Sequence, residues 1–296
     1  MKVRIGIGVG AFPLPDHLGF ARLVDDLDEL DFDSVWLPEI LTAPTIDPIA
    51  ALAFAAAHNP RVKLGTTLLL PGRNPVRLAK ELATLDVLSG GRLLTTLVPG
   101  IPRHPESEAA GVEPADRGRL MDEMLPLLRR LWSGEMVSHH GEAASFDDVC
   151  VSPMPMQQPF EFWTGGMAPA ALRRCGRFAD GWLPSACTPD EVAEAKSVID
   201  EAAEAAGRVI SPEHFGVSIG YSHHPLSTRA VQSMARTRRG VDPAAVVPTG
   251  IDGLRDLLER FLDVGFSKFV VRPLDTPHSW RAELELLAGG IADLQT

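Results

Sequence analysis

The sequence predicts one (β/α)8 barrel, the TIM barrel, with inserted loops, formed by residues 1–296 as a single domain. Two broad observations support this fold class. Short apolar strands alternate with helices along the chain, in about eight units of each. The composition, 45% hydrophobic in 296 residues, can fill one large core. A doubly wound open sheet is the alternative, and the number of alternating units favours the barrel over it.

The third observation is a complete strand–helix–strand unit between Lys63 and Gly100. Residues 63–70 are a short apolar, β-branched run before a Pro-Gly pair, which is typical of a buried strand. Asn74 and Pro75 then provide an N-cap and a first-turn proline for a helix. Ser89-Gly90-Gly91 ends this helix, and residues 92–98 form the next apolar strand. A strand that returns through a helix lies parallel to the first, with a right-handed crossover.

The chain opens with a strand predicted at residues 2–10, in which Gly6, Gly8 and Gly10 alternate with apolar residues. This spacing resembles a dinucleotide fingerprint. That interpretation is weak, because the glycines lie inside the strand and Pro13 follows where a phosphate-binding helix would begin. The glycines instead allow backbone or ligand to approach closely.

Three further elements precede the central unit. Residues 16–30 carry apolar side chains at helical spacing, residues 32–38 form an apolar strand, and residues 45–58 form an alanine-rich helix. With the central unit, the chain has therefore formed four strands and three helices by Gly100.

The second half of the chain begins with a proline- and charge-rich break at residues 101–114. A strong amphipathic helix is predicted at 116–132, and residues 137–159, which lack a helical period, indicate an inserted hairpin and loop. The later predicted strands lie at 160–165, 181–184, 214–221 and 268–272. The later predicted helices lie at 169–178, 251–264 and 279–294, and one more begins at Thr188, where Glu191 fits a capping box. Residues 222–248, polar between Leu226 and Val247, are predicted to be irregular.

The charge and composition exclude several classes of partner. A net charge of -11 and a pI near 5.3 argue against nucleic acid or an anionic membrane, which would need a basic face. No apolar run of about 18 residues spans a membrane, and Met1-Lys2-Val3 starts directly in a strand without a signal peptide. We expect a cytoplasmic protein. The three cysteines and the histidine pairs show no zinc spacing, so we expect packed, reduced thiols and no metal site.

Four segments carry a family resemblance: FDSVWLPE, LGTTLLLPGRNPVRLAKELATLDVLSGGR, DRGRLMDEMLPLLRRLWSGE and FWTGGMAPAALRRCGRFADGW. They resemble the bacterial luciferase-like monooxygenase superfamily, over nearly the whole chain. Within it the chain is most similar to the oxidoreductases that use the deazaflavin coenzyme F420, with FMN users close behind. The resemblance implies a small-molecule substrate, a homodimer and, for an FMN enzyme, a partner flavin reductase.

Fold physics and the resemblance agree on the place of the site, the carboxyl ends of the barrel strands. Gly165 and Gly166 precede a helix whose first turn leaves free N–H groups, so they either seat a cofactor phosphate or merely form a tight turn. The resemblance also implies a non-proline cis peptide at Thr67–Leu68, behind the flavin ring. The expected cofactor-binding residues are Glu39, Thr67, Leu68, Val98, Gly100, Gly165, Gly166, Met167, Ala168 and Trp182.

Candidate catalytic groups are few. Glu39 could hydrogen-bond the cofactor ring or act as an acid, and otherwise caps backbone at the strand end. His104 could donate a proton, and otherwise is a solvated loop histidine. Ile40, Ile101 and His104 are the expected substrate-pocket residues, and together with Met167 the two isoleucines suggest an apolar acceptor.

Two positions depart from the F420 pattern. Ile40 stands where these enzymes often have a His, and Ile101 where some have a Glu. Hydride transfer needs chiefly two carbons in close approach, so it survives the loss of these groups, whereas alcohol oxidation needs a base. The resemblance therefore implies an F420-dependent hydride transfer involving a small, apolar organic substrate. An FMN-dependent monooxygenase and a non-catalytic flavin-binding barrel are the alternatives. The F420 tail is polyanionic, and candidates to bind it are Arg22, Arg61, Arg73, Arg103 and Arg173.

Overall fold

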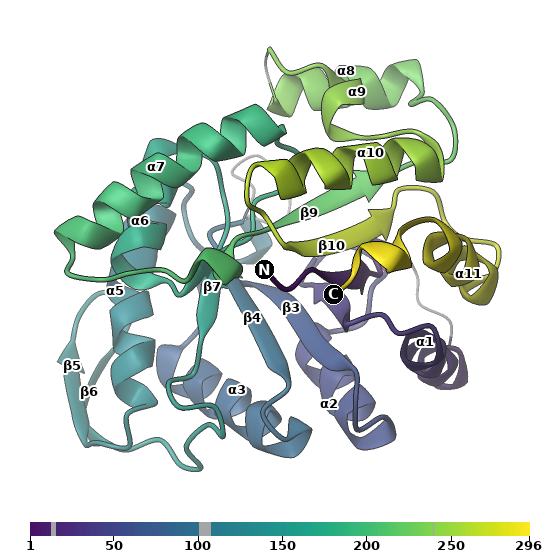
Figure 1. The fold of residues 1–296 in the computed structure, drawn as a ribbon. Coiled ribbons are helices and arrows are strands. Elements are labelled where there is room, and N and C mark those ends of the chain that lie inside the picture. Colours follow the sequence, from purple (N-terminus) through teal and green to yellow (C-terminus); the bar gives the residue numbers. More distant parts are fainter. Residues whose placement is uncertain (13–15, 101–107, 239) are drawn as a thin grey trace.

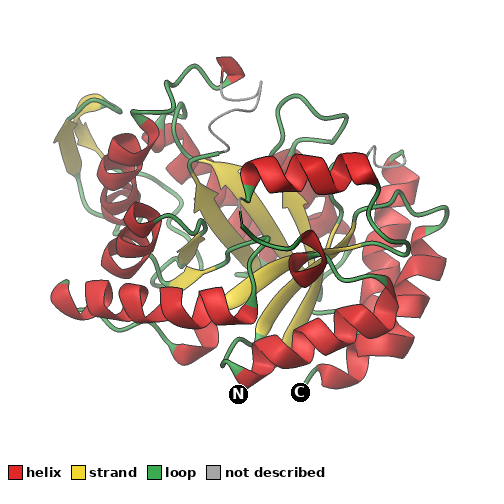
Figure 2. Ribbon diagram, turned by 90° about the horizontal axis from the view of Figure 1, so that it is seen from above, coloured by secondary structure: helices red, strands yellow, loops and turns green. Residues whose placement is uncertain are grey.

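The computed structural model describes residues 1–12, 16–100, 108–238 and 240–296. Eight parallel strands form a nearly closed barrel at the centre, and helices surround it (Figures 1 and 2). The strand order is β8-β7-β4-β3-β2-β1-β10-β9. Parallel bridges between Trp182 and Phe215 and between Ser185 and Ser218 join the two end strands. The predicted fold class is confirmed, and the open doubly wound sheet is excluded.

Outside residues 222–248, the bounds of the elements follow the predictions closely. The barrel strands are β1 Arg4–Gly8, β2 Ser34–Pro38, β3 Lys63–Leu69, β4 Leu93–Val98, β7 Phe162–Thr164, β8 Gly181–Trp182, β9 Gly216–Tyr221 and β10 Lys268–Pro273. The α-helices are α1 His17–Glu29, α2 Pro48–His58, α3 Pro75–Ser89, α5 Arg117–Leu131, α6 Pro169–Phe178, α7 Pro189–Ala205, α8 Thr228–Thr237, α9 Pro243–Val246, α10 Gly250–Asp263 and α11 Trp280–Ile291. Two short 3-10 turns are η1 Pro212–His214 and η2 Ala292–Leu294.

The helix ends have the predicted local causes. The Asn74 side chain accepts hydrogen bonds from the backbone N–H groups of the first turn of α3, and Gly90 ends that helix at φ 69°. At α7 the Thr188 hydroxyl and the Glu191 carboxylate form the full capping box. These contacts satisfy backbone groups that a helix cannot pair internally, so the helices begin and end where their sequences indicate.

The barrel strands divide their side chains between an inner and an outer face. Outer residues such as Ile7, Leu68 and Phe162 are 0% exposed and form the main hydrophobic core between strands and helices. Strand register and the neighbours of the barrel glycines together define the inner face. The inner residues used below are Gly6, Gly8, Ser34, Trp36, Lys63, Gly65, Thr67, Leu69, Leu94, Thr96, Val98, Trp163, Gly220, Lys268, Val270 and Arg272. Glycine is frequent among them, which leaves space inside the barrel.

The predicted insertion is an antiparallel hairpin, β5 Val137–His140 with β6 Ser145–Val149, followed by a loop. It lies outside the ring of barrel strands, beyond α5 (Figure 1). Both cis peptide bonds of the described chain lie in that loop, at Ser152–Pro153 and Gln158–Pro159. The predicted cis bond at Thr67–Leu68 is therefore wrong, and β3 continues through it as regular parallel strand.

Two other expectations are corrected. The segment 222–248 is not irregular, because it contains α8 and α9. Ser227 caps α8, and Asp242 caps α9 ahead of a first-turn proline, so local capping forms helices in a sequence with few apolar residues. The thiols of Cys175 and Cys187 are buried as expected, but Cys150 is exposed.

Candidate functional site

The carboxyl ends of the strands bring several of the predicted site residues together. The Glu39 backbone N–H donates to the Thr67 carbonyl at 2.8 Å, which places the end of β2 beside β3. Leu69 pairs with Val98, and a Cβ built on Gly165 would lie 3.4 Å from Val98 Cγ1. These residues surround one end of the barrel, which we call the mouth. The other predicted pocket residues, Ile101 and His104, lie outside the described residues.

Both carboxylate oxygens of Glu39 are engaged at the mouth. Oε2 accepts from the Leu69 backbone N–H at 2.8 Å, and Oε1 forms an ion pair with the Arg73 guanidinium. The Glu39 side chain is only 7% exposed. The geometry matches the strand-end capping interpretation, and a role in proton transfer stays a prediction that would require Glu39 to leave Arg73.

The turn from Gly165 to Ala168 leads from β7 into α6. Gly166 has φ 97°, a conformation that favours glycine, and Ala168 makes no side-chain cap to the first turn of α6. Pro169 has no N–H, and the Ala171 N–H donates to the Ala168 carbonyl at 2.8 Å, so the Ala170 N–H is the first-turn donor of α6 that has no side-chain cap. The Trp182 indole Nε1 donates to the Gly166 carbonyl at 3.1 Å, so this residue holds the turn in place.

Three predicted cofactor residues differ in their position relative to the inner face of the barrel. Leu68 and Trp182 are on the outer face, both 0% exposed, and Trp182 packs edge-on against Phe266. Any contact of Leu68 with a cofactor would be through its backbone. Trp182 contacts the turn at Gly166 from the outer face of the barrel. Gly100, at φ 80°, lies against Leu69 at the end of β4.

The arginines predicted to bind an anionic tail do not converge at the mouth. Arg61 precedes β3 at the opposite end of the barrel and pairs with Asp28, and Arg73 is held by Glu39. Arg22 and Arg173 are exposed on α1 and α6, and Arg103 lies outside the described residues. The neighbouring Arg174 is buried in an ion pair with Asp122 on α5, at 2.7 Å between Nε and Oδ1.

A groove of about 450 Å³ lies on the mouth rim, where the start of α3 faces α5 and the hairpin. Carboxylates of Glu113, Asp116 and Glu142 line it together with Arg73. Arg119 bridges Asp116 and Glu142. With more carboxylates than cations, this groove is a poor surface for a polyanion.

Sequence reasoning missed two inner residues near the mouth. Thr96 is buried, and its Oγ1 has no hydrogen-bond partner in the described part of the chain. Arg272 ends the inner row of β10, two residues beyond Val270. The signal for Arg272 was available, because the predicted strand 268–272 places residues 268, 270 and 272 on one face. What the sequence could not provide is which face points inward.

The described mouth residues fit a flavin-type group with a phosphate. Leu69 and Val98 offer an apolar inner wall, and the unpartnered Thr96 hydroxyl offers a hydrogen bond beneath it. The turn from Gly165 into α6 offers backbone N–H groups toward which a phosphate could be placed. No cluster of three or more His, Cys, Asp or Glu side chains suited to a metal occurs among the described residues.

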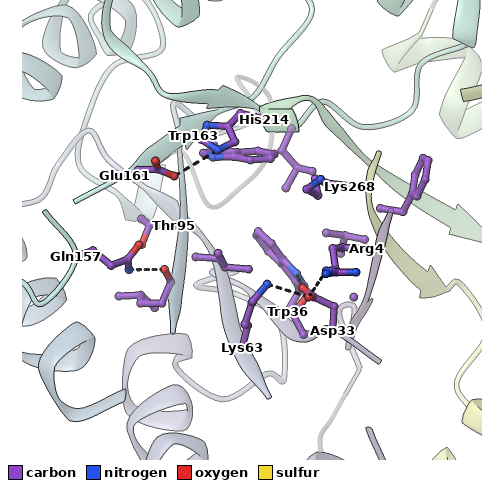
Figure 3. Close-up of a pocket in the computed structure, with 17 residues that line it drawn as sticks. Arg4, Asp33, Trp36, Lys63, Thr95, Gln157, Glu161, Trp163, His214 and Lys268 are labelled. Atoms are coloured by element: carbon purple, nitrogen blue, oxygen red, sulfur yellow. Dashed lines mark hydrogen bonds and ion pairs between the residues drawn. The ribbon is translucent and has the colours of Figure 1, made fainter. Parts of the chain in front are cut away.

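A cavity of about 200 Å³ lies at the opposite, amino-terminal end of the barrel (Figure 3). Its ionisable residues face one another. Lys63 Nζ lies 2.9 Å and Arg4 Nε 3.4 Å from Asp33 Oδ1, so both cations pair with this carboxylate. His214 Nε2 lies 3.7 Å from Glu161 Oε2. Trp36 and Trp163 cover its walls. In barrels of this fold the amino-terminal end contributes to stability and the carboxyl end to chemistry, so we assign the candidate site to the mouth.

The barrel and its mouth define a TIM-barrel protein with a glycine-containing turn before α6 at the carboxyl rim. The chain belongs to the luciferase-like monooxygenase family, whose model matches residues 3–260. This confirms the resemblance carried by the four sequence segments. Among the described residues, the helices lack an apolar stretch of the length that a membrane-spanning segment requires.

Similar proteins include both kinds of chemistry expected for the family. The chain is 27% identical to limonene 1,2-monooxygenase of Rhodococcus erythropolis over 253 residues, which cover 79% of this chain and 64% of that protein. It is 28% identical to the F420-dependent glucose-6-phosphate dehydrogenase of Microbacterium testaceum over 220 residues, covering 69% and 64%. The chain thus spans less than two thirds of the length of these relatives. An F420-dependent secondary alcohol dehydrogenase has the same fold, with a TM-score of 0.81 at 19% identity over all of both chains.

Proposed function

We propose that the chain is an oxidoreductase that binds F420 at the barrel mouth and transfers a hydride between it and a small, apolar organic substrate. The observation that carries the proposal is the Gly165–Ala168 turn, held by Trp182, at the carboxyl end of a luciferase-like barrel. The sequence similarity to an F420-dependent dehydrogenase supports the choice of cofactor.

The residues of the protein would chiefly position the cofactor and exclude water from it. When bound, the deazaflavin supplies the hydride. The turn before α6 would hold its phosphate, with the exposed Arg173 one turn into the helix. Leu69 and Val98 would exclude water from one side of the ring, and Thr96 would hydrogen-bond it. Glu39 and Arg73 would keep the ends of β2 and β3 rigid beneath it.

An FMN-dependent monooxygenase fed by a partner reductase is the second candidate. The carboxylate-rich groove on the rim and the net charge of -11 favour it, because FMN lacks the polyanionic tail of F420. The similarity to limonene 1,2-monooxygenase points the same way. A non-catalytic flavin-binding barrel is the third, and oxidation of reduced deazaflavin by any electrophilic acceptor would exclude it. A cytoplasmic homodimer completes the proposal.

Fluorescence-quenching titration of the purified chain with F420, and separately with FMN, at low and moderate salt tests the proposal. We expect micromolar F420 binding that weakens with salt, with FMN much poorer. The reverse preference would select the monooxygenase, and binding of neither would refute both.

Paired variants on α6 test the phosphate seat. Arg173→Gln should weaken binding of the preferred cofactor several-fold, because it removes a cation near the helix start. Arg177→Gln, one turn further along the same helix and also exposed, should leave the affinity unchanged. Equal effects of the two variants would place the phosphate elsewhere.

A further inference from the structure

One cationic side chain at the mouth has no partner in the part of the chain that the structure describes. Arg272, near the carboxyl end of β10, makes no hydrogen bond or ion pair with any described residue. Burial lowers the pKa of its guanidinium, and no carboxylate beside it acts in the opposite direction. The half-buried or buried arginines elsewhere are occupied, as Arg73 is by Glu39, Arg129 by Asp180 and Arg174 by Asp122.

The Arg272 side chain runs along the inner face of the barrel between two glycines. A Cβ built on Gly8 would lie 3.1 Å from Arg272 Cβ, and a Cβ built on Gly220 would lie 3.5 Å from Arg272 Cζ. The Leu274 side chain reaches the same place, 2.8 Å from the Cβ position of Gly220. The guanidinium therefore sits in a glycine-lined space with an apolar side chain beside it.

A half-buried charge without a partner among the described residues is unfavourable in the folded protein. Such groups persist at binding sites, where a ligand completes the pair. A planar guanidinium matches a carboxylate with two parallel hydrogen bonds. The anion that it receives need not be the cofactor phosphate, because strands β8 and β9 separate Arg272 on β10 from the turn after β7.

We propose that Arg272 binds the carboxylate of the substrate, so that the protein acts on an apolar organic acid. Leu274 would contact the apolar part of that acid, and Gly8 and Gly220 would leave room for its carboxylate. The assignment of the acid as the reacting molecule rests on the proposed function, whereas the carboxylate site itself does not.

Calorimetric titration of the full chain with benzoate and with its neutral analogue benzamide, and with hexanoate and hexanamide, tests the site. We expect one of the carboxylates to bind at least tenfold more tightly than its amide, and Arg272→Gln to remove that preference. Arg260→Gln is the matched control, an exposed arginine on α10, and should change nothing. Binding of neither carboxylate by the unmodified chain, or equal binding in Arg272→Gln, overturns the proposal.

The thermal midpoint provides a second readout that does not depend on ligand. Replacing an unpaired cation by an apolar side chain of similar length should stabilise the chain, so we expect Arg272→Met to raise Tm by about 2 °C. A lower Tm would show that Arg272 serves the fold and would overturn the proposal.

Titrations of Arg272→Gln with F420 and FMN separate the two possible sources of the anion. Weakened cofactor binding with unchanged carboxylate binding would assign Arg272 to the cofactor and overturn the inference. If the unmodified chain binds neither cofactor while its carboxylate preference depends on Arg272, the proposed function fails and the inference stands.

Discussion

The two ends of the barrel differ in how their charged side chains are paired. At the amino-terminal end Arg4 and Lys63 share Asp33, Lys268 faces Glu213 at 3.6 Å, and His214 faces Glu161. At the mouth Glu39 is paired with Arg73, whereas Arg272 on the inner face has no partner among the residues described. Both ends carry inner glycines and half-buried polar groups, so the difference lies in whether the charges are matched.

This contrast separates residues that hold the barrel from residues available to bind. A matched pair stabilises the fold and offers nothing to a ligand, whereas an unmatched charge lowers stability and can gain a partner on binding. Glu39 is the informative exception at the mouth, because its position favours function while its contacts favour structure. The variants below test this division.

Glu39→Ala should have the largest effect on stability. It removes the buried carboxylate of the Arg73 ion pair and leaves the Leu69 N–H without its acceptor in a 7% exposed site, so we expect a loss of about 3 kcal/mol in the free energy of unfolding. Urea denaturation followed by circular dichroism measures it. Glu81→Ala, which removes a 45% exposed carboxylate 3.8 Å from the same guanidinium, should cost less than about 0.5 kcal/mol.

Glu39→Gln decides between structure and chemistry. The amide oxygen can still accept from Leu69 N–H, so the variant should fold and bind cofactor close to normally. If the Glu39→Gln protein is stable but no longer binds either cofactor, Glu39 is a binding residue and its role is not only structural.

The glycines of β1 provide the second test, because Gly6 lies near the paired end and Gly8 near the mouth. A Cβ on Gly6 would lie 2.2 Å from Ser34 Oγ and 2.8 Å from the Trp36 ring, so Gly6→Ala should cost about 2 kcal/mol by overpacking. A Cβ on Gly8 meets Arg272 Cβ at 3.1 Å, which a small shift relieves, so its cost should be about 1 kcal/mol or less.

The two glycine variants should rank in the opposite order for ligand binding, because the variant that costs less stability should weaken binding more. Gly8→Ala displaces the Arg272 side chain and should weaken the binding of the preferred carboxylate, whereas Gly6→Ala should leave it unchanged. Urea denaturation and calorimetry on the same preparations measure both properties. If Gly6→Ala lost the carboxylate and Gly8→Ala kept it, the division between the two ends would be wrong.

Most of the barrel could be predicted from the sequence, because in each strand–helix unit the hydrophobic periodicity agrees with the Gly, Pro and capping residues at the ends of the elements. Asn74, Pro75 and Gly90 bound α3 where the pattern indicates, and the capping box at Thr188 forms as expected. The segment 222–248 was missed because α8 and α9 are defined by their caps, with too few apolar residues to reveal a period. The implied cis bond at Thr67–Leu68 had no local signal to test it.

The site was less predictable than the fold, because its chemistry depends on which side chains already have partners. The sequence placed Glu39 and Gly166 correctly at the strand ends, but it did not indicate the ion pair between Glu39 and Arg73. It counted several arginines as cofactor ligands, of which Arg61 lies at the wrong end of the barrel. It left out Arg272, whose importance follows only from the absence of a partner among the described residues.

Asp33→Ala tests the paired end with a smaller expected effect. It leaves Arg4 and Lys63 without their shared carboxylate, and since these cations are 31% and 43% exposed we expect a loss of about 1 kcal/mol. Cofactor and carboxylate binding should not change. The matched control Glu201→Ala removes an exposed carboxylate of α7 and should be neutral within about 0.5 kcal/mol. Loss of ligand binding in Asp33→Ala would link the two ends energetically.

The smallest effect concerns pH at the paired end. The hydrogen bond from the Lys2 backbone N–H, assisted by Lys268, lowers the pKa of Glu213 below its ordinary value of 4.5. A carboxyl whose folded pKa is depressed stabilises the protein above its unfolded pKa, and that contribution is lost as pH falls through the folded pKa. Glu213→Gln should therefore flatten the fall in Tm below pH 4.5 and lower Tm slightly at pH 7. Scans at pH 3.5, 4.5 and 7, with Glu201→Gln as control, measure it, and an unchanged slope would show that this contact does not contribute to the acid stability of the barrel.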